Sequence, residues 1–119
     1  MQRGNRAEGY LAEQKAAEYL KQKGYRILEH NFYSRYGEID IIAREGKYLV
    51  FVEVKYRTNI SHGTPQEAVS YSKQRTICRV ANYYCLKRGI QEGTACRFDV
   101  VAILGNDVTL FRNAFEYQG

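Results

Sequence analysis

The residues with the clearest chemical potential lie in a short apolar stretch, Val50 to Arg57, which reads VFVEVKYR. Its Val and Phe residues are typical of a buried β-strand, yet the stretch contains Glu53 and Lys55. A buried unpaired charge costs several kcal/mol, so these two side chains need partners. A second carboxylate, Asp40, stands in the preceding apolar stretch GEIDIIAR. Two carboxylates and an amine in neighbouring strands are residue types that hydrolyse phosphodiester bonds with a divalent metal.

The hairpin between these two strands decides whether the carboxylates meet. Gly46-Lys47 suits a two-residue type II′ turn, because glycine occupies its first position. The resulting antiparallel ladder pairs Glu45 with Tyr48, Ile42 with Phe51, Asp40 with Glu53, and Glu38 with Lys55. Side chains directly opposite one another start about 5 Å apart. The register therefore predicts that Asp40 and Glu53 face each other, whereas a slip of one residue would turn them to opposite sides of the sheet.

Two carboxylates in this position repel unless a cation lies between them. Hard oxygen ligands with room for water suit Mg²⁺ or Mn²⁺ better than zinc, and the backbone carbonyl of Val54 is a further candidate ligand. Lys55 would stand beside the metal and stabilise charge on a phosphate. The alternative is a salt-bridge cluster on a solvated sheet face, in which Glu38 pairs with Lys55. That alternative leaves Asp40 against Glu53 unexplained, so the metal site is favoured.

The elements that position these residues follow from the hydrophobic pattern. It predicts two helices, at 5–23 and 65–88, and five strands, at 25–32, 38–44, 47–56, 96–104 and 108–115. Thr64 as N-cap with Pro65 and Glu67 marks the start of the second helix, and Gly89 marks its end. The strand before this helix and the strand after it form a βαβ crossover with parallel strands. The expected fold is α/β, with a mixed five-stranded sheet flanked by helices in the order αβββαββ.

Length and composition limit the classes of function. The 119 residues suffice for one domain, 1–119, with a single core. A net charge of +5 favours an acidic partner, nucleic acid first. Three cysteines without a CxxC pair predict a reducing cytoplasm, and two histidines are too few for a zinc cluster. The charged N-terminus and the lack of a long apolar run predict neither a signal peptide nor a membrane partner.

The sequence also resembles a known family. Asp40 followed by Glu53-Val54-Lys55 resembles the PD-(D/E)XK nuclease motif. Further blocks are similar to the bacterial YraN family, a group of endonuclease-like proteins compared with archaeal Holliday junction resolvases. These blocks are Glu8, Asn31, Arg35, Gly37-Glu38-Ile39-Asp40, Phe51 to Lys55 with Arg57, Lys73-Gln74-Arg75, and Arg97-Phe98-Asp99-Val100. They span nearly the whole chain.

The resemblance implies a restriction-endonuclease-like core and Mg²⁺-dependent cleavage of DNA, with branched or junction DNA as a candidate substrate. It implies a catalytic set of Asp40, Glu53, Lys55 and Glu8, in which Asp40, Glu53, Glu8 and the Val54 carbonyl hold the metal. From the residues alone, a surface glutamate stabilised by the helix dipole is the favoured interpretation of Glu8, and only the family pattern assigns it to the site. A junction-cutting enzyme needs two sites, so a homodimer is plausible. The alternative function is a non-catalytic nucleic-acid-binding module that retains the fold.

Basic and aromatic residues around the motif are candidates for DNA contact. Arg35 and Arg57 lie on loops beside the motif and suit the phosphate backbone. Lys73 lies on the sheet-facing stripe of the second helix, where it either extends to solvent or reaches a phosphate. Two further assignments stay open: Arg75 fits a phosphate contact or a solvated face, and Asp99 fits an arginine partner or a catalytic role. Exposed tyrosines suit stacking on unpaired bases as well as rim positions: Tyr33, Tyr36, Tyr56 and Tyr71.

Overall fold

The computed structural model describes residues 2–57 and 69–118. It has the elements α1 (Gln2–Gln22), β1 (Arg26–Ser34), β2 (Gly37–Glu45), β3 (Tyr48–Arg57), α3 (Tyr71–Lys87), β4 (Cys96–Leu104) and β5 (Asp107–Phe115). Neither helix is long and apolar enough to cross a membrane. The predicted strands are confirmed to within one or two residues at their ends.

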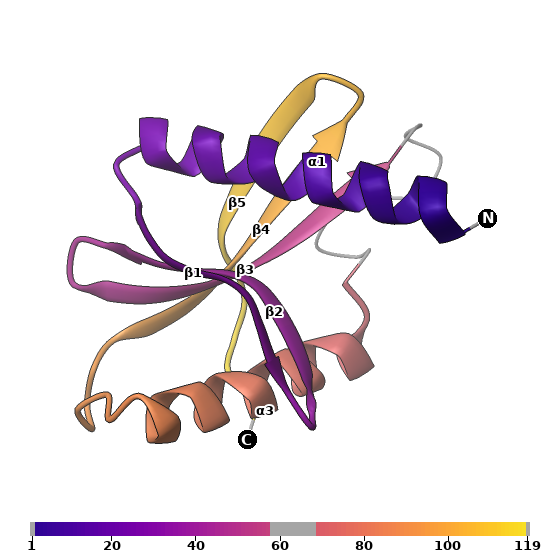
Figure 1. Cartoon of the computed structure of the whole chain (residues 1–119). Helices are drawn as coiled ribbons and strands as arrows, with labels where there is room; N and C mark the ends of the chain where they lie inside the picture. Colours follow the sequence, from indigo (N-terminus) through magenta and orange to yellow (C-terminus); the bar gives the residue numbers. More distant parts are fainter. Residues whose placement is uncertain (1, 58–68, 119) are drawn as a thin grey trace.

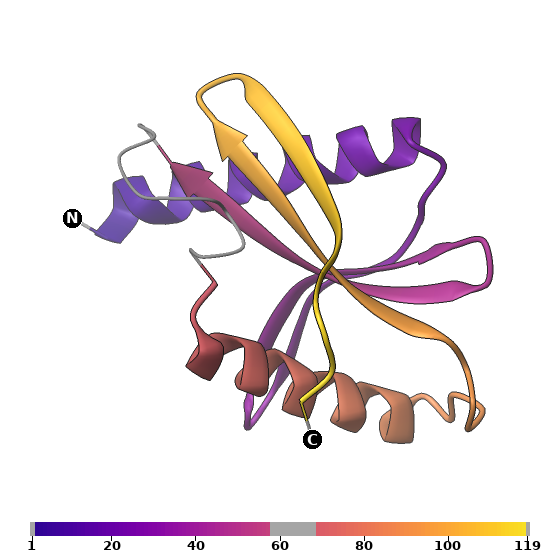
Figure 2. The ribbon, with the colours of Figure 1, turned by 180° about the vertical axis from the view of Figure 1, so that it is seen from behind.

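The five strands form one sheet in the order β1-β2-β3-β4-β5. The pairs β1–β2, β2–β3 and β4–β5 are antiparallel, and β3–β4 is parallel across the α3 crossover. The mixed α/β sheet flanked by two helices is therefore as predicted. The two helices lie on opposite faces of this twisted sheet, as both views of the ribbon show (Figures 1 and 2).

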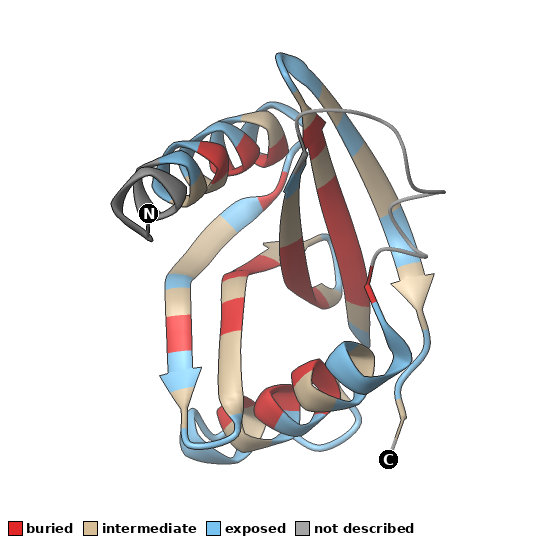
Figure 3. Ribbon diagram, turned by 90° about the vertical axis from the view of Figure 1, so that its right-hand side faces the viewer, coloured by how far each residue is buried: buried red, intermediate tan, exposed pale blue. Residues whose placement is uncertain are grey.

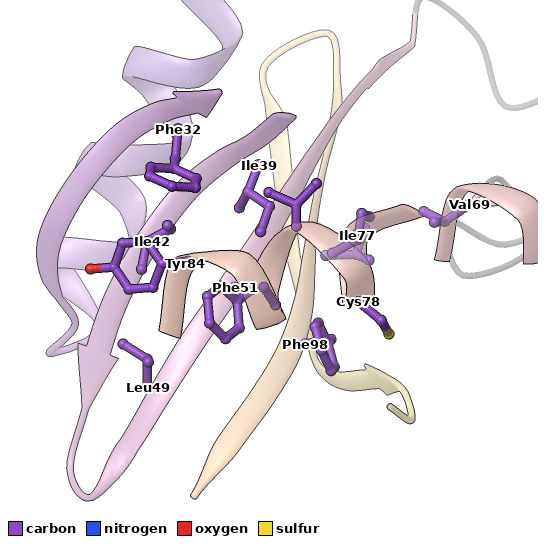
Figure 4. Packing of buried hydrophobic residues seen from close by; sticks show 13 residues of the cluster. Phe32, Ile39, Ile42, Leu49, Phe51, Val69, Ile77, Cys78, Tyr84 and Phe98 are labelled. Carbon is purple, nitrogen blue, oxygen red and sulfur yellow. The ribbon is translucent and has the colours of Figure 1, made fainter. Parts of the chain in front are cut away.

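Each face of the sheet has its own hydrophobic core. The α3 face buries Phe32, Phe51, Phe98 and Tyr84 among aliphatic side chains, with edge-to-face and stacked ring pairs 5.0–5.9 Å apart (Figure 4). The α1 face is built from small and β-branched residues, such as Ala16 and Val52. Burial is concentrated in the central strands and on the sheet-facing sides of both helices (Figure 3). Small alanines on α1 let this helix approach the sheet closely.

The start of α3 differs from the prediction. Ser70 is the N-cap, with an extended backbone (φ −60°, ψ 158°), and its side chain accepts a hydrogen bond from the Lys73 N–H. The prediction of a continuous helix from Pro65 is therefore wrong, because Ser70 has an extended backbone and caps the helix that follows it. The proposed cap at Thr64 lies outside the described residues. The predicted end is confirmed: the helix stops at Lys87, and Gly89 follows with φ 65°.

A local irregularity in the β1–β2 hairpin redirects side chains. Asn31 has a left-handed backbone (φ 50°), between the ladder pairs His30–Ile41 and Phe32–Ile39. Beyond this point Ile39 packs in the α3 core, whereas Ile41 packs in the α1 core. Simple alternation along β2 would place Ile39 and Ile41 on one face of the sheet, and this expectation is wrong. The change of face in β2 lies beside Asn31, the β1 residue whose positive φ interrupts the pleat of the hairpin.

Asp99 in β4 is fully buried, and its charge is compensated. The carboxylate accepts hydrogen bonds from the Tyr25 hydroxyl (2.7 Å), the Arg97 guanidinium (3.0 Å) and the backbone N–H of Asn113 (2.9 Å). The last bond falls where the β4–β5 register shifts. Of the two roles left open by the sequence, the structure shows the arginine pairing, and the hydrogen bond from Asn113 links β5 to the same carboxylate.

Gly37, at the start of β2, packs closely against α3. Gly37→Ala is therefore expected to destabilise the fold by about 2 kcal/mol. Its φ of 150° favours glycine, and an added Cβ would lie 2.8 Å from Cγ2 of Thr76. Gly46 offers a matched control, since its φ is 60° and a Cβ there meets open space. Gly46→Ala should cost only about 1 kcal/mol. Urea unfolding of both variants checks this, and equal costs would contradict the close contact of β2 with α3.

Candidate metal centre at the fork of the sheet

The candidate site lies where β2 and β3 separate. The two strands pair from Glu45–Tyr48 to Ile41–Val52, as the predicted turn requires, and the ladder then ends. Past this point β1 and β2 descend towards α3 while β3 rises towards α1, which gives the sheet a fork (Figure 1). Asp40 stands at the branch point, where its Oδ2 accepts a hydrogen bond from the Val54 N–H at 2.8 Å. The carboxylate thus replaces the next rung of the ladder.

This geometry corrects the predicted route to the site. Asp40 and Glu53 are not ladder partners, and neither are Glu38 and Lys55, because the strands have already diverged. The carboxyl groups of Asp40 and Glu53 nevertheless lie close enough to interact, because the charge of Asp40 raises the pKa of Glu53. The Glu53 residue is only 6% exposed. The predicted convergence of the two acids is therefore present, but as a side-chain contact across the fork.

A third element contributes an acid that the sequence analysis missed. Glu13 of α1 brings a carboxylate oxygen to a point where it, one oxygen of Glu38 and one of Asp40 all lie within 4.8 Å of one another. The Asn31 side-chain amide donates a hydrogen bond to Glu13 Oε1 at 2.7 Å and fixes its position. The irregular residue of β1 thus also orients the acid from α1. We refer to Glu13, Glu38, Asp40 and Glu53 as the acidic cluster.

Glu8, the acid implied by the family resemblance, lies elsewhere on α1. Its side chain is exposed and lines a hollow formed with Lys15, Tyr56 and Asn106, near the ends of β3 and β4. The structure does not bring it into the acidic cluster. Glu8 and Glu13 are five residues apart on α1, so their side chains point in directions about 140° apart. When Glu13 faces the acidic cluster, Glu8 points away from it.

Two lysines face the acidic cluster. Lys73 of α3 places its Nζ 3.8 Å from Oε2 of Glu53 and is half exposed. Its position confirms that it lies on the sheet-facing stripe. The positive charges of Lys73 and Lys55 both act on Asp40 and Glu53, and each lowers the pKa of these carboxyls. The site therefore has acids on the sheet side and amines at its rim.

The carboxyls titrate abnormally because they are buried together. Burial, followed by the charge of Asp40, raises the pKa of Glu53 to about 7. Burial and the charges of Asp40 and Glu38 raise the pKa of Glu13 to about 7 as well. Burial also raises the pKa of Asp40 and of Glu38. The two lysines only partly offset the rise in the pKa of these carboxyls. A divalent metal ion would neutralise the carboxylates more fully.

The backbone of β3 offers one more oxygen at the fork. The N–H and C=O of a strand residue point to the same side of the strand. Because the Val54 N–H points towards Asp40, the Val54 carbonyl also faces the β2 side, beyond the last rung of the ladder. The Val54 carbonyl is therefore expected on the side of β3 from which Asp40 approaches, and its role as a ligand stays a prediction.

The predicted DNA-contacting arginines lie around the α3 side. Arg35 is exposed at the β1–β2 turn, where its guanidinium donates a hydrogen bond to the Tyr36 hydroxyl at 3.1 Å. Arg75 is exposed on α3. The side chain of Arg57 lies outside the described residues. Arg35 and Arg75 are thus available to an external partner but do not contact the acidic cluster.

Comparison with known proteins places these features in a family. Residues 12–103 match the model of a family described as "Uncharacterised protein family UPF0102". A UPF0102 protein of Lachnoclostridium phytofermentans is 52% identical over 96% of this chain and 97% of its own length. Similar proteins from Persephonella marina and Legionella pneumophila are 45% and 42% identical, each over 92% of this chain. They cover 93% and 94% of their own lengths.

Proposed function

The chain belongs to the UPF0102 (YraN) family, and we propose that it is a metal-dependent endonuclease that hydrolyses phosphodiester bonds in DNA. The observation that carries the proposal is the convergence of four carboxyls from α1, β2 and β3 at the fork of the sheet. A net charge of +5 supports a polyanionic partner. Acids that gather in an otherwise basic protein need a specific reason, and a divalent cation supplies one.

The donor set fits Mg²⁺ or Mn²⁺. All candidate ligands are hard oxygens: the carboxylates of Glu13, Glu38, Asp40 and Glu53 and the carbonyl of Val54. No sulfur or imidazole donor belongs to the group among the described residues. When bound, the cation supplies Lewis acidity to water and to the phosphate oxygens. The raised pKa values of Glu13 and Glu53 describe the metal-free site, in which like charges are unneutralised.

The lysines supply the positive charge that phosphoryl chemistry needs. Lys55 is two residues from Glu53 on β3 and acts electrostatically on both central acids. Its ammonium is placed to stabilise charge that develops on the cleaved phosphate or to orient the attacking water. Lys73, at the α3 rim, pairs with Glu53 at 3.8 Å, and its half-exposed ammonium would be available to a phosphate beside the acidic cluster.

Metal binding and DNA cleavage by the intact chain test the proposal directly. Calorimetric titration with Mn²⁺ at pH 7.5 should show saturable binding, and a supercoiled plasmid should be nicked with Mn²⁺ or Mg²⁺ but not with EDTA. Absence of both results would overturn the proposal. Salt-sensitive DNA binding without cleavage or metal binding would favour the non-catalytic nucleic-acid-binding module.

A further inference from the structure

A pair of thiols is shared by two hollows near the C-terminal end of α3. Cys85 of α3 and Cys96 of β4 line both a hollow of about 300 Å³ and a hollow of about 520 Å³. Cys85 is half-buried and Cys96 is exposed, and neither forms a disulfide. Each of these thiols affects the pKa of the other, so their sulfur atoms lie close together. We refer to Cys85 and Cys96 as the thiol pair.

Two arginines lie in the same row of the sheet as Cys96. Arg44 is the ladder partner of Arg26 in β1 and of Leu49 in β3. Leu49 is in turn the ladder partner of Cys96. Ladder partners project from the same face of a sheet, and Leu49 packs in the α3 core, so this row faces α3. Arg44 and Cys96 start two strand spacings apart, about 10 Å, so a long arginine side chain can bring its charge near the thiol.

Arg26 and Arg44 have no counter-ion among the residues that the structure describes. Neither forms an ion pair there, although like charges directly opposite one another in a ladder repel. An anion bound between the two arginines would relieve this repulsion.

The charge of Arg44 also reaches the thiol pair. It lowers the pKa of Cys96 against the larger, opposite effect of burial. Burial, followed by the charge of Cys96, raises the pKa of Cys85 to about 11. Cys96 is therefore the exposed thiol with a cation nearby, which is the setting in which a thiolate attacks most readily.

We propose that the thiol pair is a modification site for small anionic disulfides, with glutathione disulfide as the probe. The ionised Cys96 sulfur attacks one sulfur of the disulfide, the S–S bond breaks, and one glutathione leaves as a thiolate that takes up a proton. Arg44 and Arg26 attract the carboxylates of the incoming molecule. The ionised Cys85 sulfur then attacks the Cys96 sulfur, and the second glutathione leaves in the same way. Two protein thiols are oxidised to one disulfide, and one glutathione disulfide is reduced to two thiols.

The product would tie two elements of the fold together. The new disulfide joins the last turn of α3 to the first residue of β4, across the connecting residues 88–95. In a reducing compartment such disulfides are typically transient and respond to the redox state. The proposal goes beyond the nuclease function and does not depend on it, because neither cysteine belongs to the acidic cluster.

Mass spectrometry of the intact chain, incubated with glutathione disulfide in EDTA and kept under non-reducing conditions, tests the proposal. The product should be lighter than the starting protein by two hydrogens, with Cys85 and Cys96 protected from alkylation after unfolding. Cys78, which is fully buried, should remain a free thiol and serves as the internal reference. Cys85→Ser should stop at a mixed disulfide on Cys96, heavier by one glutathionyl group. Cys96→Ser should react at least about ten-fold more slowly, because Cys85 is half-buried and its pKa is about 11.

Arg44→Gln tests the contribution of the arginines. This variant should slow the reaction with glutathione disulfide by about three-fold or more, and the reaction with the neutral hydroxyethyl disulfide by less. Lys15→Gln, which removes the same charge from α1 on the other face of the sheet, should react like the parent. An unmodified parent, a parent that stops at the mixed disulfide, or a dimer joined through Cys96 would overturn the proposal, whether or not the chain nicks DNA. Equal rates for Arg44→Gln and the parent would overturn the role of the arginines.

Discussion

Glu13→Gln is expected to weaken Mn²⁺ binding by about ten-fold or more and to reduce metal-dependent nicking by at least about 100-fold. Glu13 contributes one of the three carboxylate oxygens that lie within 4.8 Å of one another, and Asn31 holds it in place. The amide of glutamine keeps the size of the side chain but lacks the charge that a divalent cation requires. Calorimetry and plasmid nicking at matched protein concentrations measure the two effects.

Glu8→Gln is the matched control for this prediction. It makes the same chemical change on the same helix, but the Glu8 side chain is exposed and lies outside the acidic cluster. Metal binding and nicking should therefore stay at the level of the parent. The opposite result, loss with Glu8→Gln and none with Glu13→Gln, would assign the acid of α1 as the family resemblance implied and would contradict the geometry described above.

Asp40→Asn and Lys55→Ala distinguish binding from catalysis in the same assays. Asp40→Asn should lose both metal binding and nicking, since Asp40 occupies the centre of the cluster. Lys55→Ala should retain Mn²⁺ binding and lose nicking, because an ammonium stabilises the reacting phosphate without holding the cation. Unchanged nicking in both variants would indicate that a contaminant or another site cuts the DNA.

The main lines of the fold were predictable because they depend on local signals. The Gly46-Lys47 turn set the β2–β3 register correctly from Glu45–Tyr48 to Ile42–Phe51. The crossover between parallel β3 and β4 followed from the helix between two apolar strands. Such features need only turn chemistry and hydrophobic periodicity, which are properties of short segments.

Two features were not predictable from alternation: the point at which β2 and β3 separate, and the left-handed backbone of Asn31 in β1. Asn31 adopts φ 50°, and the strands separate beyond Ile41–Val52. Asparagine tolerates positive φ better than most residues, but the sequence does not say which asparagine in a strand will adopt it. Extending the ladder by alternation therefore placed Asp40 opposite Glu53. The two carboxyls instead approach one another as side chains, beyond the point at which the two strands separate.

The position of Glu13 in the sequence does indicate a site residue. It lies three, four and seven residues before Ala16, Ala17 and Leu20, all of which are buried on the sheet-facing side of α1. A glutamate on the apolar stripe of a helix faces the core side and needs a partner there. The same criterion correctly selected Glu53 in its strand. Applied to the first helix, it would have favoured Glu13 over Glu8.

In the metal-free protein, Glu53 alone is expected to lower the free energy of unfolding by on the order of 3 kcal/mol as the pH rises from about 4.5 to about 7, and Glu13 acts in the same direction. Glu53 is buried beside Asp40, and its pKa rises from 4.5 to about 7 in the folded state. The folded state therefore binds this proton more tightly than the unfolded state. The stabilisation is complete below pH 4.5 and is lost as the pH passes through the pKa of the folded protein. Urea unfolding in EDTA across this range measures the effect.

Glu53→Gln isolates the contribution of this carboxyl. Near pH 4.5 the variant and the parent should have similar free energies of unfolding, because both side chains are then neutral. At pH 8 the variant should be the more stable, by up to about 3 kcal/mol. Saturating Mn²⁺ should restore the parent at pH 8 by about 2.7 kcal/mol at 100 times the dissociation constant, and should leave the variant nearly unchanged. A stability difference independent of pH, or equal stabilisation of both proteins by Mn²⁺, would contradict a cation-binding role for Glu53. A buried acid that destabilises the fold at neutral pH until a cation binds is the behaviour expected of a binding site. Carboxyls fully neutralised by the two lysines would instead show no raised pKa and no such dependence on pH.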